Sequence, residues 1–293
     1  MKTFGEIAPF EILQPAHQRV PFLFSSPHSG AVYPDDFINQ TKLDSLSIRL
    51  SEDAFIHQLF FGVVEKGASL IFSNVPRAYV DLNRAAFELD QRLFKDKLPS
   101  HLVIHSPRVE VGLGTIPRIV ALGRDIYDDV IGLDDAISRI NNFYFPFHRA
   151  LESLLTDLVK KYGYAVLIDC HSMPSDSNAF SQTRQADFIL GNRHGISCAH
   201  ELTLAATQFL EQQGFNVVLN DPYQGGYITE HYGAPSLHKH ALQIEINRSL
   251  YMDEALIKPT GNFAMIQSIL MQLADHLMSL PDQYFFPYHI AAE

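Results

Sequence analysis

The sequence predicts an α/β protein in which helices cover both faces of a central sheet. Short apolar runs of strand length alternate along the chain with longer segments of helical periodicity, and no internal repeat, low-complexity tract or long linker separates them. A chain of 293 residues organised in this way can bury roughly 75% of the surface that it exposes when unfolded. We therefore expect residues 1–293 to form a single domain.

The first half of the chain contains strand candidates and one long helix. A helix is predicted over residues 51–66, because its apolar positions recur with helical spacing, Ser51 can cap its first turn and Gly67 can end it. Several prolines and glycines between residues 95 and 124 predict a long excursion over the surface. Strands are predicted at residues 20–26, 69–73 and 78–82.

The second half alternates helices and strands more regularly. A helical pattern spans residues 134–161, and Pro146 within it predicts a kink or a new helix start, because proline lacks the amide proton that a helix interior uses. Further helices are predicted at residues 197–213 and from about residue 260 to about residue 280. Strands are predicted at residues 164–169, 186–190, 215–219 and 241–246.

The composition excludes several classes of protein. Hydrophobic residues make up 46% of the chain and charged residues 19%, which excludes intrinsic disorder. The formal net charge is −11, whereas a nucleic-acid surface needs clustered Lys and Arg. No apolar stretch is long enough for a membrane span, no signal peptide is recognisable, and two cysteines cannot form a disulfide framework. We expect a cytoplasmic protein that binds neither nucleic acid nor membrane, with an oligomeric state that the sequence does not reveal.

Two histidines occupy similar positions after predicted strands. His28 and His171 each follow such a strand closely, and ligands of open α/β sheets bind beyond the carboxyl ends of the strands. Strand alternation places Asp169 on the side of His171, where its carboxylate could orient the imidazole, and points Cys170 to the opposite side. One such histidine is more often an ordinary loop residue, but two placed alike make a shared metal site an equally good interpretation.

A hydrolytic metal centre usually needs a carboxylate as its third ligand and an open position for water. Glu52 and Asp53 begin the helix predicted from residue 51, and either side chain could point inward. Acidic residues in a first helical turn also stabilise the helix dipole without any other role. The pattern alone therefore chooses neither between Glu52 and Asp53 nor between a ligand and a helix-stabilising residue.

Other polar residues could bind a substrate or transfer protons. Arg77, Asn83 and Arg84 lie in or beside the strand predicted at residues 78–82, and the guanidinium fork binds carboxylates bidentately, although a surface ion pair is the alternative. Glu245 alternates with aliphatic residues in the strand predicted at residues 241–246. This alternation places Glu245 either on a solvated face or in the site as a general base.

Six groups of short motifs follow one another between about residue 20 and about residue 255. They are Ser26-Pro27-His28-Ser29-Gly30, Glu52-Asp53-Ala54-Phe55, Val80-Asp81-Leu82-Asn83-Arg84, Asp169-Cys170-His171-Ser172, Gly225-Gly226-Tyr227-Ile228-Thr229 with His231-Tyr232-Gly233, and Gln243-Ile244-Glu245-Ile246. Each motif is weak alone, but together and in this order they resemble the N-formylglutamate amidohydrolase family, whose relatives include zinc carboxypeptidases and aspartoacylase.

The resemblance implies a three-layer α/β/α fold with a mixed central sheet, of the zinc-carboxypeptidase (phosphorylase/hydrolase)-like type, in a single catalytic domain. It also implies one catalytic Zn²⁺. By motif, His28, Asp53 and His171 correspond to the metal ligands, and Glu52 is the rival of Asp53.

The same resemblance assigns roles around the metal. Asn83 and Arg84 correspond to a pair that holds a substrate carboxylate, and Arg77 is a further candidate for this contact. Glu245 corresponds to the general base that takes a proton from water and passes it to the departing amine. His231 is a candidate donor to the developing oxyanion.

We therefore expect a zinc-dependent amidohydrolase that cleaves the formyl amide of an N-formyl amino acid, with N-formyl-L-glutamate as the leading candidate and formate and L-glutamate as products. Family members act in histidine degradation, but those members diverge after the glutamate where this chain continues with Ile246-Asn247-Arg248, so the acyl-amino acid stays open. Two alternatives remain. Two histidines and a carboxylate also suit a non-haem Fe(II) oxygenase, and the chain could be a non-catalytic carboxylate-binding protein.

Overall fold

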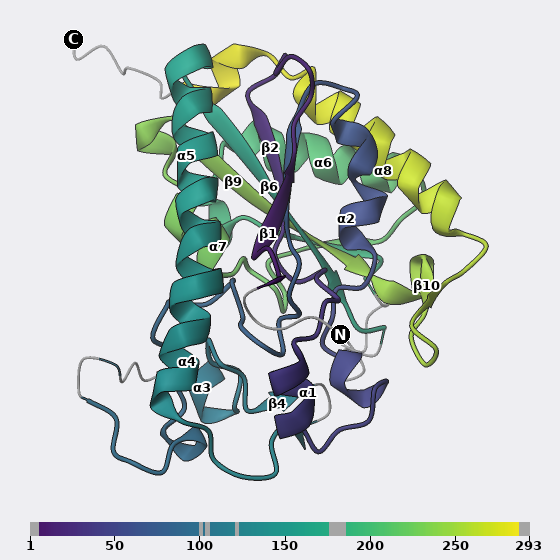
Figure 1. The fold of residues 1–293 in the computed structure, drawn as a ribbon. Coiled ribbons are helices and arrows are strands. Elements are labelled where there is room, and N and C mark those ends of the chain that lie inside the picture. Colours follow the sequence, from purple (N-terminus) through teal and green to yellow (C-terminus); the bar gives the residue numbers. More distant parts are fainter. Residues whose placement is uncertain (1–5, 100–101, 103–105, 121–122, 176–185, 287–293) are drawn as a thin grey trace.

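The computed structural model of the chain describes residues 6–99, 102, 106–120, 123–175 and 186–286. Within these residues a seven-stranded sheet runs through the centre of the molecule, with its strands in the order β1-β3-β2-β6-β9-β7-β8 (Figure 1). The strands are Phe10–Leu13 (β1), Phe22–Ser26 (β2), Ser69–Ser73 (β3), Ala165–Met173 (β6), Phe188–Gly191 (β7), Val217–Leu219 (β8) and Lys239–Asn247 (β9).

The sheet is mixed. β3, β2, β6 and β9 run parallel to one another, β1 pairs antiparallel with β3, and β7 pairs antiparallel with β9. β8 returns to a parallel pairing with β7. The predicted mixed sheet is therefore confirmed.

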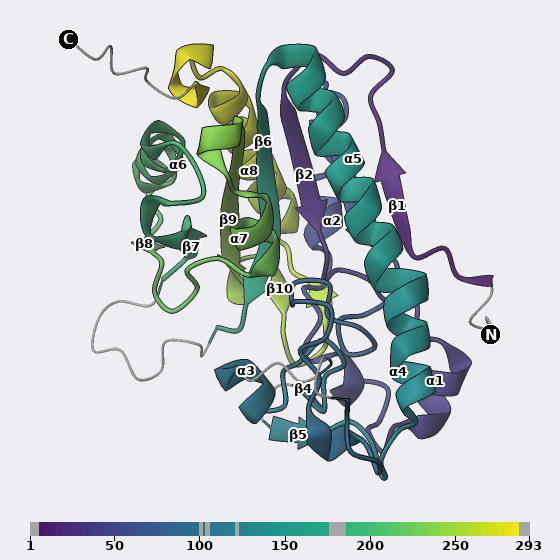
Figure 2. The ribbon, with the colours of Figure 1, turned by 90° about the vertical axis from the view of Figure 1, so that its left-hand side faces the viewer.

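The alternating side chains of the strands build a separate apolar layer on each face of the sheet. Leu167 and Ala241 pack into one layer, and their sequence neighbours Ile168 and Leu242 pack into the other. The first layer contains α4 (Leu133–Arg139), α5 (Phe145–Tyr162) and α7 (Tyr227–Tyr232), and the second contains α2 (Ile56–Leu59), α6 (His200–Gln212) and α8 (Phe263–Met278). Figures 1 and 2 show α5 and α8 on opposite sides of the sheet, which confirms the three-layer α/β/α fold.

The same alternation gathers polar side chains at the carboxyl ends of the central strands. Asp169 and His171 lie on the α5 side of β6, whereas Cys170 is buried in the layer of α6 and α8, as strand alternation predicts. In the register of β6 with β9, His171 lies beside Glu245 and Asp169 beside Gln243. One end of the sheet face therefore carries four polar side chains on two neighbouring strands.

The helix predicted over residues 51–66 begins five residues too early and extends too far. α2 covers only Ile56–Leu59 and is followed by the 3₁₀ turn Phe61–Val63. The Asp53 amide donates to the His28 carbonyl oxygen at 3.0 Å, and Phe55 adopts a left-handed conformation with φ of 67°. Residues 52–55 are therefore not helical, because Asp53 is hydrogen-bonded to the loop after β2 and Phe55 has a backbone conformation that a right-handed helix excludes.

The strand predicted at residues 78–82 is also wrong. The Tyr79 amide donates back to the Pro76 carbonyl oxygen at 2.9 Å, and the Asp81 amide donates to the Thr115 carbonyl oxygen at 2.8 Å. The segment therefore forms turns, because these bonds occupy the amides that a strand would direct to a neighbour.

The helical pattern at residues 134–161 is divided as the proline predicts. α4 continues through a π-helical turn, Ile140–Tyr144, and α5 begins at Phe145 with Pro146 in its first turn.

The chain also contains short helices and strands, and Figure 2 shows α3, β4 and β5 beyond the end of the sheet toward which β2 points. They are α1 (Asp35–Gln40), α3 (Pro107–Glu110), β4 (Ile119–Val120), β5 (Arg124–Asp125), β10 (Met252–Asp253) and β11 (Lys258–Pro259). None of the helices in the described ranges is both long and apolar enough to cross a bilayer.

Candidate active site

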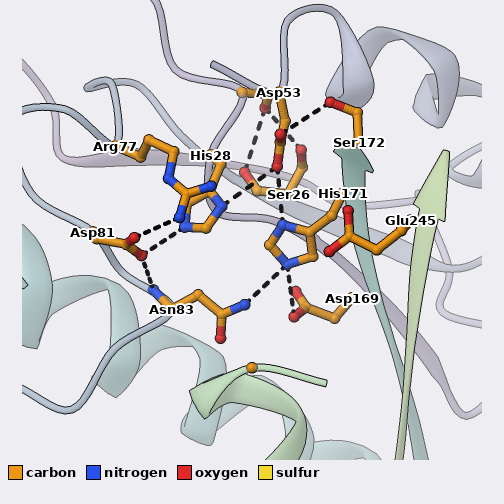
Figure 3. Close-up of polar contacts among 12 residues, drawn as sticks. Ser26, His28, Asp53, Arg77, Asp81, Asn83, Asp169, His171, Ser172 and Glu245 are labelled. Atoms are coloured by element: carbon orange, nitrogen blue, oxygen red, sulfur yellow. Dashed lines mark hydrogen bonds and ion pairs between the residues drawn. The ribbon is translucent and has the colours of Figure 1, made fainter. Parts of the chain in front are cut away.

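Three buried side chains converge at the carboxyl end of the sheet. His28 comes from the turn after β2, Asp53 from the turn before α2, and His171 from the end of β6 (Figure 3). One donor atom of each side chain lies within 4.8 Å of the other two, and each side chain is almost completely buried. Two imidazole nitrogens and one carboxylate oxygen are a suitable donor set for Zn²⁺ or Fe(II), and they leave room for further ligands.

The Nε2 atom of each imidazole, on the side of the ring away from Asp53, contacts a further carboxylate. Nε2 of His28 lies 2.7 Å from Oδ1 of Asp81, and Nε2 of His171 lies 2.9 Å from Oδ2 of Asp169. A carboxylate only accepts hydrogen bonds, so both Nε2 atoms carry a proton, and each Nδ1 would give its lone pair to a metal ion when one is bound. The predicted contact between Asp169 and His171 is therefore present.

The two Nδ1 atoms face Asp53. Oδ2 of Asp53 lies 3.0 Å from Nδ1 of His171 and 3.4 Å from Nδ1 of His28. Nδ1 of His28 is buried and has no hydrogen-bond partner among the described residues, which is unusual for a polar atom. A metal ion held by these three atoms would satisfy this nitrogen.

The charges of the cluster are strongly coupled. Burial would raise the pKa of Asp53, but the hydrogen bond from His171 and the electrostatic attraction of both histidines lower that pKa well below the usual value. Burial would likewise lower the pKa of His171, but Asp169 and Asp53 raise it well above the usual value. Asp53 is therefore ionised, which is the state that a metal ligand needs.

Asp53 and its neighbour Glu52 point in different directions. Oε1 of Glu52 accepts a hydrogen bond from the Tyr33 hydroxyl at 2.5 Å and another from Nε of Arg49 at 2.9 Å. Of the two carboxylates that the sequence left open, only Asp53 belongs to the histidine cluster.

Glu245 lies beside the cluster without belonging to it. Its side chain is 6% exposed, and its position on β9 places it next to His171 (Figure 3). Burial raises the pKa of Glu245 to about 8, although the charge of His171 opposes this shift. A carboxyl group with a pKa near neutrality can both accept and return a proton, as a general base requires.

A cavity of about 380 Å³ opens onto these residues, and basic side chains line it. The cavity borders the cluster and Glu245 as well as Asn83 and Tyr223. Its arginines are Arg77, Arg84, Arg108 and Arg248. Carboxylates line the cavity as well, and Arg77 and Arg248 are paired with Asp81 and Asp53. Four arginines around one cavity of a protein with a net charge of −11 still favour an anionic ligand.

The predicted carboxylate-binding residues all border this cavity. Nη2 of Arg77 donates to Oδ2 of Asp81 at 2.7 Å, whereas Arg84 is held by backbone carbonyl oxygens at 3.0 Å and 2.7 Å. Oδ1 of Asn83 accepts from the Ile228 amide at 2.7 Å, and its Nδ2 lies 3.2 Å from Nε2 of His171. The turn that replaced the predicted strand thus places all three residues at the site.

His231 lies elsewhere. Its imidazole is exposed at the end of α7 and stacks on Tyr227, with ring centroids 5.0 Å apart. It lines a separate surface pocket together with Lys239 and is not among the residues that line the cavity of the histidine cluster. The structure does not bring His231 to the other site candidates, and we give it no role in the chemistry.

Several residues of the site were not predicted from the sequence. Ser172 donates to Oδ1 of Asp53 at 2.9 Å, and Nη2 of Arg248 lies 3.3 Å from the same oxygen. Asp81 and Gln243 belong to motifs that the sequence analysis quoted, and strand alternation also places Gln243 on the face of Glu245. For Arg108, no sequence pattern indicated a place at the site.

The known proteins that this chain resembles belong to one family. The model of the N-formylglutamate amidohydrolase family matches residues 20–252. A Pseudomonas aeruginosa protein named N-formylglutamate deformylase is 30% identical over 247 residues, which cover 83% of this chain and 86% of the relative. A Pseudomonas putida protein of the same name is 28% identical over 275 residues, covering 90% and 94% of the two chains.

Solved structures show the same fold. The crystal structure of an N-formylglutamate amidohydrolase from Ralstonia eutropha JMP134 superposes with a TM-score of 0.88 at 31% identity, covering 93% of this chain and 98% of that one. A gene product of Agrobacterium tumefaciens superposes with a TM-score of 0.67 at 20% identity, covering 92% and 93% of the two chains. The second likeness concerns the fold alone.

Proposed function

The chain belongs to the N-formylglutamate amidohydrolase family, and we propose that it hydrolyses N-formyl-L-glutamate to formate and L-glutamate with the help of Zn²⁺. It is an enzyme, a hydrolase of carbon–nitrogen bonds other than peptide bonds. The observation that carries the proposal is the arrangement of His28, Asp53 and His171 beside Glu245 in one arginine-lined cavity.

The residues present fit a zinc ion. His28 and His171 would donate through Nδ1 and Asp53 through a carboxylate oxygen. Asp81 and Asp169 would fix the orientation of the two imidazoles, which is the usual arrangement behind metal-bound histidines. When bound, Zn²⁺ supplies a Lewis acid that activates water at neutral pH and polarises a carbonyl oxygen.

The chain's own residues would carry the proton transfers. Glu245 takes one proton from the attacking water, whose oxygen bonds to the formyl carbon. The same carboxyl group then returns the proton to the amide nitrogen while the carbon–nitrogen bond breaks. The products are formic acid and the free amine of glutamate, and formic acid becomes formate when its proton passes to the amine or to solvent. The burial that raises the pKa of Glu245 to about 8 suits a group that performs both steps.

The arginines of the cavity would bind the glutamate moiety. N-formylglutamate carries two carboxylates, and Arg84 and Asn83 lie deep in the cavity, beside the histidine cluster. Arg108, which is exposed on α3 and lines the same cavity, is placed to contact the second carboxylate. Holding the carboxylates there would leave the small formyl group over the metal.

Replacing Arg84 with alanine should raise KM for N-formylglutamate by roughly 10- to 150-fold, because a hydrogen bond to a charged group contributes about 1.5–3 kcal/mol. Arg84→Lys should recover only part of the loss, since an ammonium group cannot form a bidentate contact. Steady-state kinetics measures both values. Arg149→Ala, at an exposed arginine outside the cavity, is the control. An unchanged KM in Arg84→Ala would remove Arg84 from the binding site.

The choice between the two neighbouring carboxylates is testable by metal content. Asp53→Asn should lose most of its zinc, because a neutral amide replaces the charged donor of the cluster. Glu52→Gln should keep one zinc per chain, because its contacts with Tyr33 and Arg49 lie outside the cluster. Elemental analysis of protein purified without chelator gives the answer. Full zinc occupancy in Asp53→Asn would contradict the proposed ligand set.

A substrate screen tests the proposed function as a whole. We expect formate release from N-formylglutamate, with weaker turnover of N-acetyl and N-carbamoyl amino acids. Iron in the purified protein together with substrate-dependent oxygen uptake would indicate an oxygenase instead. Tight binding of N-formylglutamate without any turnover would indicate a carboxylate-binding protein.

A further inference from the structure

Gln243 connects the proposed base to the backbone of a neighbouring loop. It precedes Glu245 by two residues on β9, so both side chains leave the strand on the same face. Nε2 of Gln243 donates to Oε1 of Glu245 at 2.8 Å, and the Gly226 amide donates to Oε1 of Gln243 at 2.8 Å. Gln243 is 3% exposed and Glu245 is 6% exposed, so little water can replace either bond.

The orientation of the Gln243 carboxamide is fixed by chemistry. A backbone amide can only donate, so the atom of Gln243 that faces Gly226 must be the carbonyl oxygen. The amino group must then face Glu245, where it meets an oxygen that accepts. The two bonds therefore support each other, because rotating the carboxamide would break both.

The loop that supplies the Gly226 amide is itself firmly held. A Cβ atom at Gly226 would lie 2.3–2.5 Å from the carboxamide atoms of Asn83, so the backbone packs directly against that side chain. Oδ1 of Asn83 accepts from the Ile228 amide at 2.7 Å. Residues 226–228 are thus fixed between the side chains of Asn83 and Gln243, and they give Gln243 a rigid point of attachment.

Fixing the carboxylate of Glu245 in one orientation would help the proton transfer proposed for it. Glu245 and Arg77 line the same cavity, and the positive charge of Arg77 attracts the carboxylate of Glu245. The bond from Gln243 holds one carboxylate oxygen on β9. The other oxygen stays available for proton transfer.

We propose that Gln243 is a positioning residue that holds Oε1 of Glu245, so that Oε2 meets the proton of the attacking water. This inference rests on the proposed amidohydrolase function. Gln243 lines the cavity, but its hydrogen bonds are with Gly226 and Glu245, and in this role it acts through Glu245.

The test is a double-mutant cycle on the full chain, assayed with N-formylglutamate. Gln243→Met keeps the length of the side chain and removes both bonds. We expect its kcat to fall by about 10- to 100-fold, because a misplacement of a catalytic group by about 1 Å can cost about 10²-fold, with KM within about twofold of wild type and zinc content unchanged. In a Glu245→Gln background the same change should alter kcat by less than about twofold, because the base that Gln243 positions is already absent.

Two further variants make the result unambiguous. Gln243→Glu keeps the shape of the side chain and an acceptor for the Gly226 amide, so it tests the bond to Glu245 even where Gln243→Met unfolds. Its kcat should also fall. Gln212→Met, at an exposed position of α6, is the matched control and should behave as wild type.

Three results would overturn the inference: wild-type kcat in Gln243→Met or Gln243→Glu, a change in KM alone, or an equal loss of kcat when Glu245 is already replaced. Absence of turnover by the wild-type enzyme is a different result, since it would overturn the proposed function itself.

Discussion

Replacing His171 with alanine should abolish metal binding and reduce N-formylglutamate hydrolysis to the background rate. His171 supplies one of only three donor atoms in the cluster, and the remaining pair, His28 and Asp53, cannot form a closed site for Zn²⁺. Removing an outer partner of a metal ligand typically costs about 10- to 100-fold in metal affinity or activity, and removing the ligand itself should cost more.

Metal analysis and kinetics on the same preparation measure both effects of His171→Ala. His200→Ala is the matched control, because His200 is an exposed histidine at the start of α6. A His171→Ala protein with one zinc per chain would show that the metal site lies elsewhere. A zinc-free protein with full activity would show that the reaction does not need the metal.

The second large effect concerns Glu245. Glu245→Gln keeps the shape of the side chain, and Nε2 of Gln243 can still donate to its carbonyl oxygen, so folding and zinc content should be preserved. The amide cannot accept the proton of water, and loss of a general base typically lowers the rate by about 10²- to 10⁴-fold. The loss should appear in kcat, whereas KM should change little.

Glu211→Gln, at an exposed position of α6, is the control for this variant. If Glu245→Gln loses its zinc, Glu245 is a metal ligand and the proposed division of roles is wrong. If it retains most of the wild-type kcat, the proton acceptor must be another group. The two results are separable because zinc content is measured independently of the rate.

Strands β2, β3, β6, β7 and β9 were predictable because nearly all of their residues are buried, whereas the partly exposed edge strand β1 was not predicted. The apolar runs around Leu167, Ile168 and Leu242 favour central strands, and alternation placed Asp169 on the side of His171. The pattern left Glu245 either on a solvated face or in the site, and the family resemblance gave it the role of the base.

The loops were not predictable in the same way. Apolar spacing favoured a helix through Asp53, but a hydrogen bond from its amide to the loop of His28 and the left-handed Phe55 decide the observed turn. Both depend on contacts between segments far apart in the sequence, which a local pattern does not contain. The choice between Glu52 and Asp53 depends on the same turn, so the local pattern could not separate them, although the family resemblance favoured Asp53.

The turns around Asp81 were also not predicted, because they too depend on a contact with a segment far away in the sequence. The Asp81 amide donates to the carbonyl oxygen of Thr115, which lies more than thirty residues later in the chain. The sequence around residues 78–82 does not contain this contact, so it could not exclude the predicted strand. The turn is also the reason why Asp81 reaches His28. For His231 the motif predicted a place in the site, but the residue is exposed on α7 and lines another pocket.

The central claim is that the cluster of His28, Asp53 and His171 holds the zinc ion on which deformylation depends. Stepwise return of Zn²⁺ to chelator-treated enzyme, with formate release from N-formylglutamate measured at each step, tests it most directly. The account predicts negligible activity without metal and a linear rise that ends at one zinc per chain. Full activity in the metal-free enzyme, with no response to added Zn²⁺, would contradict it.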